Sequence, residues 1–134
     1  MANYYATARS NYFLVKDKEA FAVAMTDLGV GVWDDREDGR VGVYPDYGDS
    51  NGWPSYDPEE DKDIEFTHIV AAHLADDEVC VLQEVGAEKL HYLNGYAIAF
   101  TNELATDAAA GVAVSLEDIY AKAAELGNCT PAQY

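Results

Sequence analysis

Acidic side chains are the residues of this sequence whose number and spacing indicate a chemistry. Between positions 34 and 65 the chain has twelve carboxylates and three basic side chains. These 32 residues therefore carry nine (12 − 3) of the 17 net negative charges. Charge at this density raises the self-repulsion of a compact chain, so folding alone does not account for it. The chemistry it indicates is the binding of cations: metal ions, basic peptides, or the positively charged grooves of nucleic-acid-binding proteins.

The acidic segment has two parts. The first is predicted to lie at a hairpin tip and consists of Asp34, Asp35, Glu37 and Asp38. The second is an alternating series with one further acid inside it: Asp57, Glu59, Glu60, Asp61, Asp63 and Glu65. Alternate side chains of an extended strand share a face and repeat about every 6.6 Å.

Mimicry of nucleic acid requires more charge than one such strand offers. A DNA strand has one phosphate per roughly 3.4 Å of axis, about twice the density of the alternating series. The hairpin tip, or the acids at positions 76–78, would have to lie alongside it. The alternative interpretation of the acidic segment is a solvated loop without a partner.

Aromatic residues lie among the acids. Tyr47, Trp53 and Tyr56 belong to an irregular polar stretch, so we predict that they anchor a protein partner which the carboxylates attract. Trp33 and Tyr44 lie on predicted strands instead, and we expect them to pack in the core.

Calcium or small-ligand binding is the alternative function. Asp34-x-Arg36-x-Asp38-Gly39 resembles the start of a calcium loop, but the third position is Arg and the twelfth is Pro45. Residues 46–52 add oxygen donors without a recognised spacing. This alternative places the ligand in the loop between residues 46 and 65.

Catalytic signals are weak. His68 and His73 are five residues apart, which is about 140° around a helix, so they do not converge. His91 begins a predicted strand, and the sequence has none of the HExxH, GxSxG, P-loop or GxGxxG motifs. We therefore expect a protein that is not an enzyme and has no cofactor.

The pattern of the chain predicts one α+β domain over residues 1–134, with an acidic irregular loop at about 45–62. We expect an antiparallel or mixed sheet with about three helices packed on one face, in the order βαββ-βαββ-α. The expected strands cover 4–15, 30–33, 41–44, 63–66, 78–85 and 89–101. The expected helices cover 18–28, 67–75 and 115–126, and the last is expected to bury Leu116, Ile119, Tyr120, Ala123 and Leu126.

Compartment signals favour the cytoplasm of a bacterial host cell. Cys80 and Cys129 are far apart and are expected to be free thiols. The first ten residues are polar, unlike a signal peptide, and no apolar run approaches the roughly 20 residues of a membrane span. The charge of −17 argues against direct binding to nucleic acid or to an anionic membrane.

Two segments of the chain resemble known small acidic proteins of plasmids and phages. Residues 7–13 (TARSNYF) with 15–17 (VKD) are similar to the N-termini of such proteins, and 86–90 (GAEKL) with 95–97 (GYA) add to the likeness. Mobile-element proteins of this size and acidity include anti-restriction and anti-CRISPR inhibitors, several of which are DNA mimics. The resemblance implies no functional residues.

The sequence thus favours a non-enzymatic inhibitor from a mobile element. Its carboxylates would occupy the basic, nucleic-acid-binding groove of a host defence complex, either a CRISPR effector or a restriction enzyme.

Overall fold

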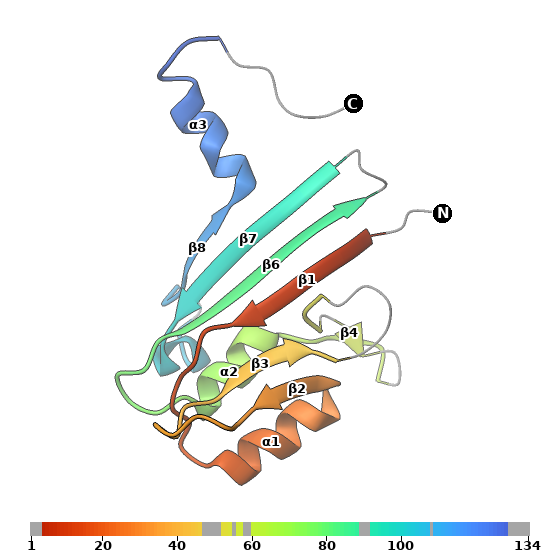
Figure 1. The fold of residues 1–134 in the computed structure, drawn as a ribbon, viewed down its shortest axis with the longest axis vertical. Helices are drawn as coiled ribbons and strands as arrows, with labels where there is room; N and C mark the ends of the chain where they lie inside the picture. Colours follow the sequence, from red (N-terminus) through yellow and green to blue (C-terminus); the bar gives the residue numbers. More distant parts are fainter. Residues whose placement is uncertain are drawn as a thin grey trace.

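A four-stranded antiparallel sheet forms one half of the fold. Its strands are β1 (Tyr4–Ser10), β6 (Cys80–Glu88), β7 (Tyr92–Phe100) and β8 (Val112–Ser115), in the order β1-β6-β7-β8. Figure 1 shows them side by side. The structure is a computed structural model, and it describes residues 4–46, 52–54, 56–57, 60–88, 92–107 and 109–128.

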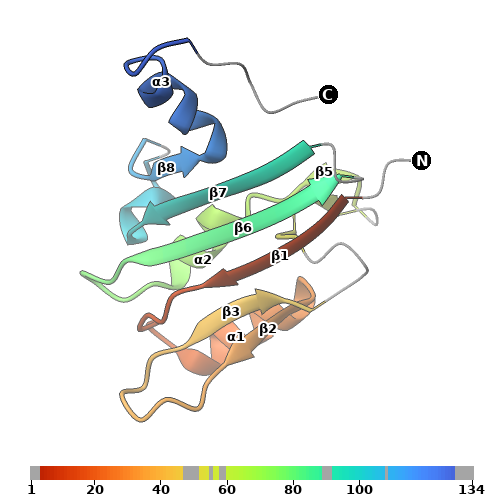
Figure 2. The ribbon, with the colours of Figure 1, turned by 45° about the horizontal axis from the view of Figure 1, so that its top comes forward.

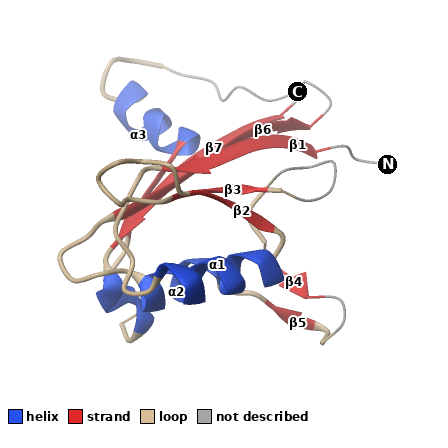
Figure 3. Cartoon of the chain, turned by 60° about the horizontal axis from the view of Figure 1, so that its bottom comes forward, coloured by secondary structure: helices blue, strands red, loops and turns tan. Residues whose placement is uncertain are grey.

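The second half consists of two small hairpins and two helices. The first hairpin pairs β2 (Val30–Trp33) with β3 (Gly42–Pro45) and follows α1 (Lys18–Asp27). The second pairs β4 (Tyr56–Asp57) with β5 (Lys62–Asp63) and precedes α2 (Phe66–His73). Figure 3 shows α1 and α2 on the same side of the strands.

Helix α1 begins and ends where its sequence predicts. Asp17 accepts hydrogen bonds from the backbone N–H groups of Glu19 and Ala20, which would otherwise lack partners in the first turn. Gly29 follows the C-cap with φ = 74°, a left-handed conformation that glycine adopts without strain. Both predictions are confirmed.

The core lies between the inner face of the sheet and the two helices. Phe13 joins the halves: it is fully buried, it bridges to Val41 beside β3, and its ring meets Phe21 of α1 edge-on at 5.9 Å. Ser10 is the one buried polar residue of the described chain, and its hydroxyl accepts a hydrogen bond from Val43 N–H at 2.8 Å. This bond satisfies both the buried Ser10 hydroxyl and the backbone N–H of Val43.

The predicted α+β class is confirmed, with antiparallel sheets. Several bounds differ from those predicted. The first strand ends at Ser10 rather than at 15, and β6 continues through the expected turn at 86–88. Phe66 begins α2 instead of ending a strand. The 3₁₀ helix η1 (Asn102–Ala105) and strand β8 were not predicted.

The C-terminal helix differs most from its prediction. Ser115 and Asp118 do form a capping box, and the helix begins as a 3₁₀ turn, η2 (Leu116–Asp118), followed by α3 (Ile119–Ala123). None of the five residues expected to be buried is buried, and Leu126 is 92% exposed. The inner face of the sheet already packs on α2, and α3 extends from the edge strand β8 instead (Figure 1).

Candidate acidic binding site

The fold separates the two parts of the acidic segment. The tip of the β2–β3 hairpin, which contains Asp34 to Asp38, lies on one side of the molecule, at the left of Figure 1. The β4–β5 hairpin lies on the opposite side, and the views in Figures 1 and 2 agree on this. The tip therefore does not lie alongside the alternating series, which was one of the two arrangements that mimicry of a DNA strand would require.

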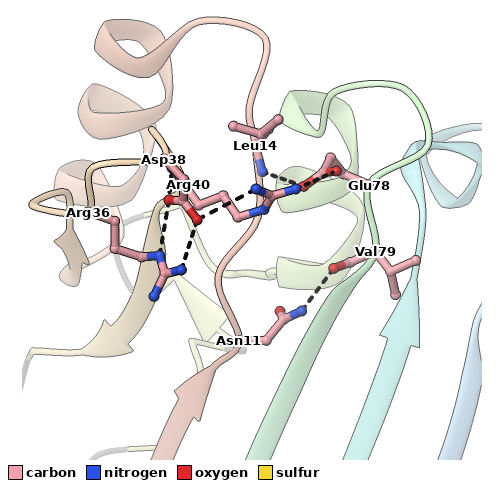
Figure 4. A network of polar contacts seen from close by, with 7 residues as sticks. All are labelled: Asn11, Leu14, Arg36, Asp38, Arg40, Glu78 and Val79. Atoms are coloured by element: carbon pink, nitrogen blue, oxygen red, sulfur yellow. Dashed lines mark hydrogen bonds and ion pairs between the residues drawn. The ribbon is translucent and has the colours of Figure 1, made fainter.

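Basic side chains neutralise most of the β2–β3 tip. Asp34 Oδ1 lies 2.8 Å from Lys18 Nζ, and Asp38 accepts two hydrogen bonds from the Arg36 guanidinium. Arg40 lies 3.6 Å from Asp38 and 3.5 Å from Glu78 (Figure 4). With Glu78 included, five acids and three cations lie here, a net charge of −2 (3 − 5), and Asp35 and Glu37 are exposed.

Glu78 links this tip to the main sheet. Its side chain is 18% exposed and accepts a hydrogen bond from Leu14 N–H at 2.8 Å as well as one from Arg40. Nearby, Asn11 donates to the carbonyl of Val79 at 3.0 Å, as Figure 4 shows. Of the acids at 76–78, Glu78 therefore lies at the hairpin tip, where it pairs with Arg40.

The pKa of Asp38 lies well below its usual range because Arg36 donates to the ionised carboxylate and Arg40 N–H adds a backbone hydrogen bond. A lowered folded-state pKa means that this carboxylate favours folding above its unfolded pKa and loses that contribution as acid protonates it. We expect carbon NMR to find Asp38 still ionised at about pH 3, where exposed aspartates are mostly protonated. Arg36→Ala should raise this pKa toward 3.8, the unperturbed value. A wild-type pKa near that value would contradict the pairing.

Sequence reasoning missed an aromatic cluster on the outer side of the β2–β3 hairpin. Trp33 and Tyr44 were expected in the core, but both are half-buried and stack on each other at 4.6 Å. Arg9 lies 4.8 Å from the Trp33 ring, and Arg36 lies 4.5 Å from the ring of Tyr12. Their strands pair so that these aromatics share the face opposite the buried valines. The signal in the sequence is Gly31, which directly faces Tyr44 across the ladder and leaves room for its ring.

The alternating acids do not form a straight row. Positions 57 and 63 lie on the two paired strands β4 and β5, and Asp61 has φ = 51° in the connecting turn. The chain then enters α2 directly after Glu65. The run at 56–65 therefore folds back on itself, whereas an irregular loop to about residue 62 and a short strand at 63–66 were expected. We call the ten residues 56–65 the acidic hairpin.

Folding back concentrates the charge. The acidic hairpin has six acids and one lysine, a net charge of −5 (1 − 6). Glu60, Asp61, Asp63 and Glu65 are exposed, and Lys62 Nζ lies 2.6 Å from Glu60. Glu59 and Tyr47 lie outside the described residues, as do the side chains of Tyr56 and Asp57.

A hollow of about 590 Å³ lies against the acidic hairpin. Its polar lining comes from Glu60, Lys62, Asp63, Glu65 and His68, and its apolar lining comes from Leu28, Ile64 and Ile69. His68 lies 3.7 Å from Glu65, which would hold the imidazole when it is protonated. Carboxylates above an apolar floor suit the side chains of lysine and arginine, whose alkyl stems pack on apolar surface while their heads pair with acids.

Trp53 does not stand free as the predicted anchor. It is half-buried and stacks on Phe66 at 5.2 Å, and its backbone N–H donates to Glu84. It also lines a smaller, mostly apolar cavity of about 250 Å³ between the start of α2 and the inner sheet residues Leu82 and Ile98. Trp53 therefore anchors the chain that leads to the acidic hairpin.

The calcium alternative gains no support from the described residues. No three His, Cys, Asp or Glu side chains of that part of the chain converge as metal ligands. Asp34 and Asp38, the acids of the calcium-like motif, pair with cations instead. Most of the 46–52 loop lies outside the description.

Two further predictions concern the cysteines and the membrane. Cys80 is buried in the core as a free thiol, and burial raises its pKa, whereas Cys129 falls outside the described residues. Within the part of the chain that is described, every helix is too short or too polar to cross a bilayer.

Comparison with known proteins finds no match to any family model, and no curated protein or solved structure is significantly similar to the chain.

Proposed function

We propose that the protein is a non-enzymatic inhibitor that binds a basic, nucleic-acid-binding surface of another protein through its acidic hairpin. The protein would come from a mobile element, and its target would be a CRISPR effector or a restriction enzyme of the host. The observation that carries it is the charge of −5 held by ten residues beside a hollow with an apolar floor.

The two acidic regions differ in how far cations of the chain itself already pair with their acids, and this difference supports the acidic hairpin as the binding region. At the β2–β3 tip, ion pairs within 4 Å already occupy Asp34 and Asp38. The sequence of the acidic hairpin has six acids and one lysine, so lysines and arginines of a partner would meet carboxylates in excess over cations. A partner's basic side chain entering the hollow would replace water around Glu65, whose side chain is 74% exposed.

Geometry favours a compact knob over a strand-like imitation of DNA. The acidic hairpin is too short to follow many phosphates along a groove. It can occupy the part of a basic groove where nucleic acid enters, and block it by steric exclusion and charge. Such binding is steered by long-range attraction, so association is fast at low ionic strength.

Competition with nucleic acid tests this proposal. The protein would be immobilised and exposed to purified CRISPR effectors and restriction enzymes, with and without their DNA or guide RNA. We expect one of them to bind and to be displaced by its own nucleic acid. Binding that is unaffected by saturating nucleic acid would contradict occupation of the groove.

A further inference from the structure

The outer face of strands β6, β7 and β8 is mostly apolar, whereas β1 adds Thr7 and Arg9 to the same side of the sheet. Cys80 and Leu82 point into the core, so the alternate residues of β6 and their ladder partners point outward. In β6, β7 and β8 these outward positions are Val81, Gln83, Val85, Ala87, Leu93, Gly95, Ala97, Ala99, Val112 and Val114. Leu93 is 65% exposed and Val112 is 69% exposed, so the described chain leaves this face largely open.

Helix α3 extends the same surface. Leu116 lies over Gly95, where an added Cβ would come within 2.9 Å of Leu116 Cγ. Ile119 is 59% exposed, and α3 has no buried residue. A helix this short has little stability in water on its own, so contact of its apolar side chains with another surface would stabilise it.

Charge restricts what can cover this surface. None of these ten positions carries a charge, although the whole chain carries −17; Arg9 of β1 and Glu117 and Asp118 of η2 border them. A second copy of the chain would be repelled wherever carboxylates meet carboxylates. The outer face of β6–β7–β8 is therefore a surface on which two copies can touch while their acidic ends stay apart.

The edge strand β8 and the area of the exposed apolar surface also favour contact with a second copy. All four residues of β8 are exposed, and β8 pairs only with β7 among the described strands. An unprotected edge strand readily pairs with another chain. The exposed aliphatic residues of the sheet and α3 add up to several hundred Å², which approaches the roughly 800 Å² per partner of a stable interface.

We propose that the outer face of β6–β7–β8, together with the apolar side of α3, is the interface of a symmetric homodimer. The same patch on both copies makes a self-complementary contact. The acidic hairpin belongs to the other layer of the fold, so it stays free in the dimer. This proposal does not depend on the proposed function.

Sedimentation velocity at about 5 to 200 µM protein tests the dimer. We expect wild-type protein to reach twice the monomer mass, and Val114→Lys to weaken dimerisation at least about tenfold, because it places an ammonium in the apolar contact. Val23→Lys is the matched control, since Val23 is 62% exposed on α1, and it should dimerise like wild type.

The dependence of dimerisation on salt concentration is a second test of the dimer. Screening reduces the repulsion between two chains of −17, so the dimer should become tighter as salt rises.

If Val114→Lys failed to fold, Ile119→Lys on the exposed helix would replace it. A wild-type chain that stays monomeric at 200 µM and high salt, or a dimer that neither variant weakens, would overturn the proposal.

Discussion

Reversing two charges of the acidic hairpin should lower the affinity for the basic partner about a hundredfold. In the double variant Asp63→Lys with Glu65→Lys, both changes are in residues that line the hollow. Each removes a charge-assisted contact worth about 1.5 kcal/mol, and together about 3 kcal/mol corresponds to roughly a hundredfold in Kd. Biolayer interferometry with the partner found by nucleic-acid competition would measure the change.

The opposite side of the molecule offers a matched control. Asp35→Lys with Glu37→Lys changes the net charge by the same four units, and both acids are exposed on the β2–β3 tip. If general attraction explained binding, both double variants would lose affinity equally. A local site predicts that only the hairpin variant loses most of it, and equal losses would remove the acidic hairpin from the site.

Truncation of Phe13 should destabilise the fold by about 3–5 kcal/mol. Phe13 is fully buried and contacts residues on both sides of the joint between the two halves: it bridges to Val41 and packs edge-on against Phe21. Phe13→Ala leaves a cavity there that the rigid strands cannot close. Since small domains have only about 5–15 kcal/mol of stability, urea denaturation should show a large drop in midpoint.

Tyr12→Ala is the control for this truncation. Tyr12 precedes Phe13 but lies half-buried in the outer cluster, with Arg9 and Arg36 near its ring. Its loss removes cation–π contacts of about 1 kcal/mol rather than a core ring. If Phe13→Ala were as stable as Tyr12→Ala, packing of Phe13 between the two halves would not be a major source of stability.

Local signals in the sequence predicted the local structure well. Asp17 and Gly29 marked both ends of α1, and the turn at Gly39 marked the β2–β3 hairpin, where φ is 80°. Strand β8 was missed because the residues before Ser115 are mostly alanine, glycine and valine without a clear alternation of polar and apolar positions. The apolar spacing of the last helix predicted burial, but spacing does not say which surface will cover it.

The site was harder to predict than the fold. Strict alternation from Asp57 to Glu65 is typical of one strand, yet Asp61 adopts a left-handed backbone that reverses the chain, which alternation does not reveal. The pairing of Asp38 with Arg36 and of Glu78 with Arg40 decides which acids are available to a partner. The first pair is local, but the pairing of Glu78 with Arg40, 38 residues apart, depends on the fold, so the sequence showed the acids but not all of their partners.

The dependence of partner binding on salt tests the central claim most directly. Affinity would be measured from about 50 to 500 mM salt for wild-type protein and for the Asp63→Lys, Glu65→Lys double variant. The account predicts that wild-type binding weakens steeply as salt screens the acidic hairpin, and that the slope becomes shallower in the variant. Binding that does not change with salt, or an unchanged slope in the variant, would contradict an electrostatic site at the acidic hairpin.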